Sequence, residues 1–290
     1  MSAAVCFHKE GKMCAPDQGN TPERKAGTET YSYRGVAEMT GLLGRRQART
    51  QAAFFTPYLH AGMRLLDCGC GPGSITCDLA GIVIPGEVLG IDFDPKQVEL
   101  ATAYAAQRGV TNVRFQPADV YALPFPEGSF DAVFASGLVE HLSEPLRALQ
   151  EMRRVLRPGG LLGVRAGDAD GLIVAPQNSE PAKLPPLIKQ MQALHGHDAC
   201  IGKHLRGLFH QAGCVGVVAS ASCDCWGTPE SLGAWVEAAR SLVGPDGPLA
   251  RLGLIDAERA AELAAGLRAW AEDPSAFVAL PYCEAVGQVE

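Results

Sequence analysis

Several features that would assign a function class are missing from this sequence of 290 residues. It has no concentrated run of Lys and Arg and carries a formal net charge of −7, whereas a nucleic-acid partner needs a basic face that displaces counterions from phosphates. No apolar stretch reaches the ~18 residues that span a bilayer, and residues 1–30 lack the apolar middle of a secretory signal. We therefore expect a cytoplasmic protein without a nucleic-acid partner or a membrane span.

The ten cysteines include no pair at the C-x-x-C spacing that is typical of zinc sites. They are also too sparse for the disulfide framework of a small secreted domain, so we expect them to be reduced. The pairs Cys68/Cys70 and Cys223/Cys225 have C-x-C spacing, which fits alternation along a strand. The histidines at 195, 197, 204 and 210 lack acids at ligand spacing and are interpreted as helix-surface or substrate-side residues. No metal site is predicted.

The pattern of apolar residues divides the chain into a flexible leader, residues 1–30, and a single domain, residues 31–290. A helical pattern over 45–59 comes first. Short apolar runs at 64–68, 87–93, 113–116, 130–136 and 161–165 then alternate with helical segments at 74–81, 95–108 and 145–156. This alternation predicts a parallel sheet that is covered on both faces.

The second half of the chain has a different pattern. Residues 183–212 are mostly helical, 214–225 and 277–287 are predicted strands, and 229–244 and 256–272 are helices between them. We predict an α/β fold with a Rossmann-like, doubly wound, mostly parallel seven-stranded sheet, N-terminal helices and a helical insertion before the last strand. A core of about 45–167 would bind a cofactor, and 183–290 would supply substrate-side helices and last strands. The inserted helices either cover the ligand mouth or pack on the sheet edge.

A glycine-rich loop at residues 69–73 is the most informative segment. An apolar strand runs into three glycines and then a helix, so the backbone can approach a ligand closely. A dinucleotide-binding loop has Gly or Ala where this sequence has Ser74. Asp67 precedes the first glycine, and a carboxylate there would repel pyrophosphate but accept hydrogen bonds from an ammonium group. The ligand is therefore predicted to be cationic at that end.

Two further acids follow predicted strands. Asp92 ends the second strand about 20 residues after the loop, where a carboxylate can accept from both ribose hydroxyls of a nucleoside. Asp94, just before Pro95, is interpreted as a helix cap. Asp119 follows the third strand and can accept from the exocyclic amine of adenine. Together with Asp67, these acids predict a site for an amino acid, a ribose and a base.

With these residues, segment 63–165 resembles the core of the class I S-adenosylmethionine-dependent methyltransferases. The matching motifs are Leu-Asp-x-Gly-x-Gly-x-Gly at 66–73, Gly-Ile-Asp-Phe-Asp at 90–94, Leu-Pro-Phe-Pro-Glu-Gly-Ser-Phe-Asp at 123–131, Val-Glu-His-Leu at 139–142 and Leu-Arg-Pro-Gly-Gly at 156–160. Their order resembles the branch of the ubiquinone and menaquinone C-methyltransferases and natural-product methyltransferases. The resemblance implies S-adenosyl-L-methionine as cofactor, S-adenosyl-L-homocysteine as product, and methylation of carbon, oxygen or nitrogen in a small molecule.

The resemblance also implies a set of cofactor-binding residues. Asp67, Gly69 and Gly71 would face the methionine part, and Ser136 would lie near the sulfonium. Ribose and adenine would be held by Asp92, Phe93, Ala118, Asp119 and Val120. Tyr33 and Tyr31, which precede the first helical segment, are interpreted either as an aromatic lid over the ligands or as anchors of the leader.

His141 follows the fourth strand and is the predicted catalytic residue. Its side chain can take a proton from a phenol, an enol or an ammonium group near neutral pH, or it packs on the following helix. Glu140 beside it is interpreted as solvated. Tyr31, Trp226 and Tyr282 are the candidates for substrate contact.

Three alternatives to methyl transfer onto carbon, oxygen or nitrogen stay open. The chain could bind S-adenosylmethionine without methylating, since a fold does not fix a function, or its cysteines could mark an arsenite or thiol methyltransferase. A nicotinamide oxidoreductase is disfavoured by Asp67 and Ser74. The expected partner is a small-molecule substrate, and the expected assembly is a monomer or homodimer.

Overall fold

The computed structural model describes Tyr31 and residues 37–290. The leader predicted for residues 1–30 lies outside the described residues, as does Tyr33. The strands are β1 Leu65–Cys68, β2 Val88–Asp92, β3 Val113–Pro117, β4 Phe130–Ser136, β5 Leu156–Gly167, β6 Ile173–Ala175, β7 Val215–Trp226 and β8 Phe277–Gln288. The helices are α1 Ala37–Leu43, α2 Ala48–Gln51, α3 Ser74–Val83, α4 Pro95–Arg108, α5 Pro145–Arg154, α6 Leu184–Leu194, α7 Leu205–Gln211, α8 Pro229–Val243, α9 Pro248–Arg251 and α10 Ala257–Ala271.

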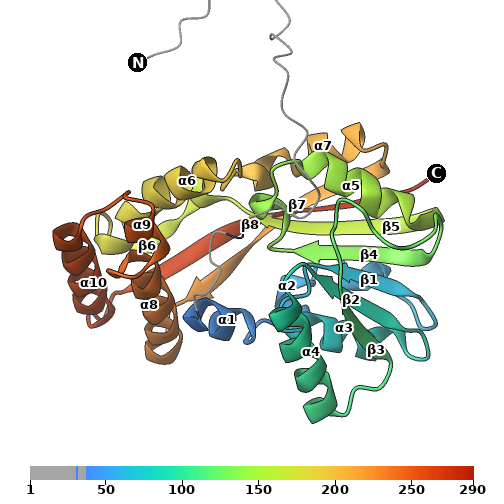
Figure 1. The fold of residues 1–290 in the computed structure, drawn as a ribbon, viewed down its shortest axis with the longest axis horizontal. Helices are drawn as coiled ribbons and strands as arrows, with labels where there is room; N and C mark the ends of the chain where they lie inside the picture. The colour runs from blue at the N-terminus through green and yellow to red at the C-terminus, as the bar shows by residue number, and fades with distance from the viewer. Residues whose placement is uncertain (1–30, 32–36) are drawn as a thin grey trace, which may run out of the picture.

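The strands form one sheet in the order β3-β2-β1-β4-β5-β8-β6, and β7 pairs with the other edge of β8 (Figure 1). Strands β1 to β5 are parallel, and β8 is antiparallel to β5, β6 and β7. The predicted doubly wound, mostly parallel sheet is confirmed. The predicted count of seven strands is wrong, because Ile173–Ala175 adds β6. Three residues are too few to show a strand pattern in the sequence.

Alternate residues of the central strands pack into two apolar layers. Leu66 of β1 and Val133 of β4 lie in the layer that includes α5 and α7, whereas Leu65 and Phe134 lie in the layer with α2 and α3. This alternation follows from the period of two along a strand. It places helices on both faces of the sheet, and the carboxyl ends of β1, β2 and β4 meet at one edge.

Local chemistry sets where the helices begin and end. Asp94 accepts a hydrogen bond from the backbone N–H of Lys96 at 3.0 Å, which confirms it as the cap of α4, and Pro95 stands in the first turn. The helix predicted over 45–59 is wrong in part, because only Ala48–Gln51 and a 3-10 turn at Thr56–Tyr58 form. The chain breaks there to insert Phe55 beneath the sheet, where it is fully buried.

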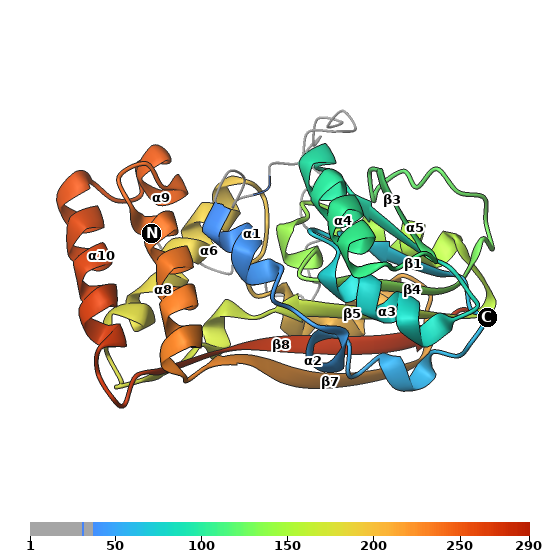
Figure 2. The ribbon, with the colours of Figure 1, turned by 90° about the horizontal axis from the view of Figure 1, so that it is seen from below.

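Strands β7 and β8 extend beyond the central sheet and carry a second group of helices. We call α6, α8, α9 and α10 the helical lobe (Figures 1 and 2). Its apolar core includes Leu184, Met191, Leu232, Val236, Val243, Leu249, Leu263, Leu267 and Trp270. Helix α1 contacts α8 and so joins the lobe to the central domain. Within the described residues, no helix is both long enough and apolar enough to cross a bilayer.

We expect Phe55→Ala to lower the free energy of unfolding by about 3–5 kcal/mol, because truncating a buried ring leaves a cavity. Phe55 is 0% exposed, and its ring stacks on Phe134 with centroids 5.8 Å apart. Phe93→Ala is the matched control, since Phe93 is 45% exposed. Urea denaturation of the ligand-free protein measures both. Equal losses in the two variants would contradict the packing described here.

Candidate active site

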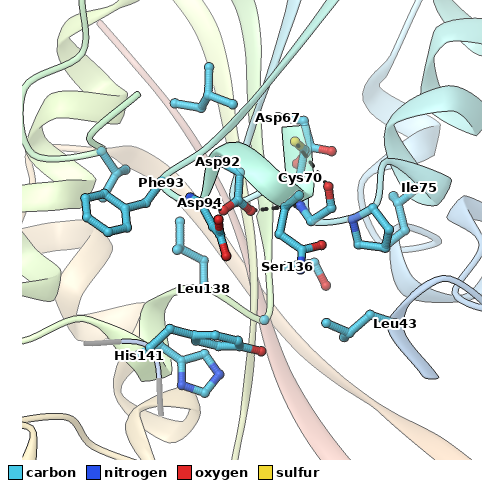
Figure 3. Close-up of a pocket in the computed structure, with 18 of the residues that line it drawn as sticks. Leu43, Asp67, Cys70, Ile75, Asp92, Phe93, Asp94, Ser136, Leu138 and His141 are labelled. Carbon is cyan, nitrogen blue, oxygen red and sulfur yellow. Dashed lines mark hydrogen bonds between the residues drawn. The ribbon is translucent and has the colours of Figure 1, made fainter. Parts of the chain in front are cut away.

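A cavity of about 180 Å³ opens at the carboxyl ends of β1, β2 and β4. Nine of the ten predicted cofactor-binding residues line it, and Tyr33 alone lies outside the described residues. We call it the first cavity. Figure 3 shows Asp92 and Phe93 on its wall, with Asp67 and His141 on opposite sides of the view. The lining residues that the sequence did not single out include Met39, Thr40, Leu43, Arg46, Cys70, Gln97 and Leu138.

Asp92 holds the loop that borders the first cavity. Its Oδ2 accepts a hydrogen bond from the N–H of Gly71, and its Oδ1 accepts one from the N–H of Asp94, both at 2.9 Å. Burial raises the pKa of Asp92, and the two backbone bonds oppose that shift. Each carboxylate oxygen has two lone pairs, so Asp92 can still accept from a ligand.

Asp67 is a buried acid with one side-chain partner. Thr76 Oγ donates a hydrogen bond to its Oδ2 at 2.6 Å, and the carboxyl group is 3% exposed. Burial raises the pKa of Asp67 to about 7, with a smaller contribution from the neighbouring charge of Asp92. Asp67 is therefore close to half ionised at neutral pH, and a nearby cation would favour its charged form.

The three glycines of the loop have different roles. A Cβ on Gly73 would lie 2.7 Å from the Cβ of Ala101, so this glycine allows α3 to approach α4. A Cβ on Gly69 would lie 3.1 Å from a methyl of Leu138. A Cβ on Gly71 would meet no atom within 4 Å, although Gly71 lines the cavity. Gly71 thus leaves open space beside the first cavity, whereas Gly69 and Gly73 allow close packing against Leu138 and Ala101.

A second cavity of about 540 Å³ lies between the central sheet and the helical lobe. All three predicted substrate residues, Tyr31, Trp226 and Tyr282, line it. Its apolar wall includes Leu172, Leu184, Ile188, Trp235, Ala238 and Leu242, several of them from α6 and α8. Of the two helices inserted before the last strand, α8 lines this cavity, as does the earlier helix α6, whereas α10 packs on α8.

The two cavities meet at a junction, which we define as the residues that line both. These are Tyr31, Met39, Leu43, Arg46, Gly137 and His141. His141 is half-buried in a 3-10 turn at Val139–His141, and its ring meets that of Tyr31 edge-on with centroids 5.0 Å apart. The structure brings the predicted site residues His141 and Tyr31 to this junction, together with Arg46 and Gly137, which the sequence did not single out.

Burial lowers the pKa of His141 to about 3, helped by the neighbouring His197 and Arg46. The imidazole is therefore neutral near pH 7 and can accept a proton, but it holds that proton weakly. Gln192 Nε2 lies 3.5 Å from its Nδ1, and the ring of His197 lies 6.4 Å away, centroid to centroid. His197 is buried at 6% exposure, so it does not lie on a helix surface.

The interpretation of Glu140 as a solvated residue is wrong. The Glu140 side chain is 6% exposed and lines the second cavity. Its Oε1 accepts a hydrogen bond from the N–H of Gly167 at 3.0 Å. The turn after β4 folds back onto the end of β5, which buries a residue that its exposed-looking sequence context did not reveal. Burial raises its pKa, opposed by the Gly167 bond and by Arg46 and Arg165.

A buried ion pair lies beside the second cavity. Arg165 Nη2 of β5 donates to Asp224 Oδ1 of β7 at 2.7 Å, and the two side chains are 1% and 8% exposed. The guanidinium also lies over the Tyr282 ring, 3.8 Å from its centroid. Arg46 Nη2 donates to Tyr282 Oη at 2.6 Å and lies 3.6 Å from Asp224. These charges are distant in sequence, so no local pattern paired them.

Asp168, Asp170 and Cys200 are the one group of three potential metal ligands found among the described residues. Asp170 already pairs with Lys189 at 2.6 Å and Lys203 at 2.9 Å. Those ammonium groups lower the pKa of Asp170 and neutralise its charge. We interpret the group as part of an ion-pair network in which only Asp170 of the three is exposed.

Comparisons with known proteins identify the family to which the chain belongs. A methyltransferase domain family matches residues 66–164. An uncharacterized methyltransferase of Schizosaccharomyces pombe is 34% identical over 192 residues, which cover 62% of this chain and 67% of that protein. The chain belongs to the S-adenosylmethionine-dependent methyltransferases. Its cofactor is accordingly S-adenosylmethionine, and the nicotinamide alternative is wrong.

Further matches are shorter or more distant. The chain spans 45% and 40% of the length of two other methyltransferase relatives. Among solved structures, the YcgJ protein from Bacillus subtilis has a TM-score of 0.56 at 18% identity, covering 83% of this chain and 98% of that one. The [4+2]-cyclase SpnF has a TM-score of 0.50 at 23% identity, covering 92% and 84%. At these identities the structures support the methyltransferase fold alone.

The first cavity fits S-adenosylmethionine in its donor set. The Oγ of Ser136 is buried and has no hydrogen-bond partner among the described residues. Asp67 and Asp92 offer acceptors for an ammonium group and for hydroxyls, and the half-exposed Phe93 ring offers an apolar face for a base. Asp119, whose Oδ1 accepts from the N–H of Tyr121 at 2.9 Å, completes the wall with Ala118 and Val120.

We expect Asp92→Ala to weaken S-adenosylhomocysteine binding by about 1–3 kcal/mol, because it removes an acceptor for ligand hydroxyls and two bonds that hold the loop. Isothermal titration calorimetry measures the affinity. Asp94→Ala is the comparison variant, and it should chiefly cost stability of about 1 kcal/mol through the lost cap of α4. Unchanged affinity in Asp92→Ala would mean that the ribose does not lie at Asp92.

Proposed function

We propose that this methyltransferase transfers a methyl group from S-adenosylmethionine to a small molecule held in the second cavity. The observation that carries this proposal is the junction, whose residues, Gly137 and His141 among them, line both cavities. An acceptor in the second cavity would then lie in line with a donor held in the first. Alignment of this kind is worth on the order of 7–11 kcal/mol in favourable cases.

The cofactor, when bound, supplies an activated methyl group on a sulfonium. The chain's own residues have three tasks in our proposal. Asp67 and Asp92 bind the charged and hydroxylated parts, the Ser136 end of β4 borders the reacting centre, and Tyr31 covers the junction. The helical lobe excludes water from the second cavity, which strengthens every polar contact there.

His141 is the proposed base at the junction. Its lowered pKa keeps the imidazole unprotonated near neutral pH, so the ring can take a proton from a hydroxyl or amine. Because a base of pKa about 3 retains a proton poorly, it would serve acceptors that become acidic as the new bond forms. Whether a carbon, oxygen or nitrogen atom is methylated depends on which molecule fits beside His141.

The raised pKa of Asp67 predicts a pH-dependent affinity. Below pH 7 the carboxyl group is protonated in the free protein, so binding an ammonium group at Asp67 must release that proton. Affinity for S-adenosylhomocysteine should rise with pH, by at most about tenfold per unit, and level off above about 7. Calorimetry from pH 6 to pH 8 measures it. Asp67→Asn keeps an acceptor for Thr76 and should remove the slope; a slope that persists would place the ammonium elsewhere.

Replacing His141 by Asn should lower turnover by about 10²-fold or more if it acts as a base, and should spare cofactor affinity. Methyl transfer from labelled S-adenosylmethionine, assayed over a panel of apolar phenols and amines, measures this. His210→Asn, an exposed change on α7, is the control. Turnover equal to wild type would leave His141 with a packing role only.

A thiol or arsenite acceptor is the second candidate, because the exposed Cys223 and Cys225 both line the second cavity. Cys223→Ser and Cys225→Ser should then abolish methylation of thiols or arsenite while leaving phenols and amines unaffected. The remaining alternative is a protein that binds S-adenosylmethionine without transferring its methyl group. The likeness of fold to a [4+2]-cyclase supports this alternative. Release of labelled methyl into product distinguishes it.

A further inference from the structure

Glu140 has one satisfied and one unsatisfied oxygen. Oε1 accepts from the Gly167 N–H, whereas Oε2 is buried and has no hydrogen-bond partner in the part of the chain that the structure describes. A buried carboxyl oxygen without a donor destabilises the fold, and more so when it is charged. Among the described residues this oxygen therefore has no donor, and the buried Arg165 Nη1 has no acceptor.

The neighbouring cations do not supply that donor. Arg46 pairs with Asp224 and Tyr282, and Arg165 pairs with Asp224 and Glu284. Both guanidinium groups still face Glu140 closely enough to favour its ionised form. Glu140 thus offers an acceptor to whatever enters the second cavity, which it lines.

Glu140 also lies close to the junction. A Cβ built on Gly137, which borders both cavities, would be 4.0 Å from Glu140 Oε1 and 3.0 Å from Arg46 Nη1. A group bound at Glu140 would therefore lie beside His141 and near the first cavity. The opposite wall of the second cavity is apolar and carries Trp226 and Trp235, whose rings are 6.3 Å apart.

We propose that Glu140 recognises the methyl acceptor through a hydroxyl or amine N–H of that molecule, the remainder of which is apolar. This inference rests on the proposed function of the second cavity. Glu140 is then a specificity-determining residue: it accepts the donor hydrogen bond that fixes the acceptor group at the junction. Ethers lack that donor and carboxylates repel Glu140, so both bind poorly.

Three matched probes test the inference: 4-butylphenol, 4-butylaniline and 4-butylanisole, titrated calorimetrically into the protein saturated with S-adenosylhomocysteine. The phenol and aniline should bind at least about tenfold more tightly than the anisole, the range expected for a hydrogen bond to a charged group. Glu140→Gln keeps an acceptor for the Gly167 N–H but presents an N–H to the cavity. It should reduce the preference to less than about twofold.

Glu258→Gln, an exposed change in the first turn of α10, is the matched control and should keep the wild-type preference. The thermal shift that S-adenosylhomocysteine causes verifies folding of each variant; if Glu140→Gln does not fold, the wild-type preference alone decides. Equal binding of all three probes to wild type, or an unchanged preference in Glu140→Gln, overturns the role of Glu140. Binding of no probe overturns instead the second cavity as the acceptor site.

Discussion

The buried ion pair between Arg165 and Asp224 is the contact on which the substrate side of this protein depends. It joins β5 of the central sheet to β7, which shares no direct strand pairing with β5. Arg165 and Asp224 are 1% and 8% exposed, so burying either charge without the other would be costly. Gln51 donates to the same Asp224 at 3.0 Å, and Arg165 Nε to Ser222 Oγ at 3.2 Å. The position of β7, and of the helices that follow it, is thereby fixed relative to the cofactor loop.

Burial shifts the pKa values of Asp67 and His141, two groups that line the first cavity, in opposite directions. It favours the neutral form of each, so the pKa of Asp67 rises to about 7 and that of His141 falls to about 3. The cavity therefore carries less charge than its sequence suggests. A cationic ligand restores the charge of Asp67, whereas His141 stays neutral with or without it. The protonation state of Asp67 therefore changes when a cationic ligand binds, whereas that of His141 does not.

The central sheet and most of the residues that line the first cavity could be predicted because they are encoded locally. Strand β4 and helix α4 match the predicted bounds, and Asp67, Asp92 and Asp119 lie within or just after strands that the apolar runs mark. Three features escaped prediction: Glu140 looks solvated until β5 covers it, Arg46 reaches the junction from a turn with no pattern, and Asp224 finds Arg165 across 59 residues of sequence. Each depends on tertiary contacts that no window of the sequence contains.

Strand β8 pairs with β5, β6 and β7 over its length, so one continuous backbone supports both cavities. The walls differ in origin, however. Backbone loops at strand ends shape the first cavity, whereas side chains of α8, such as Trp235 and Leu242, shape the second cavity from outside the sheet. Substitutions on that face of α8 change the contour of the second cavity and leave the lining of the first intact. The scaffold can therefore diversify its chemistry one helix at a time, and α8 is the element that a protein engineer would redesign first.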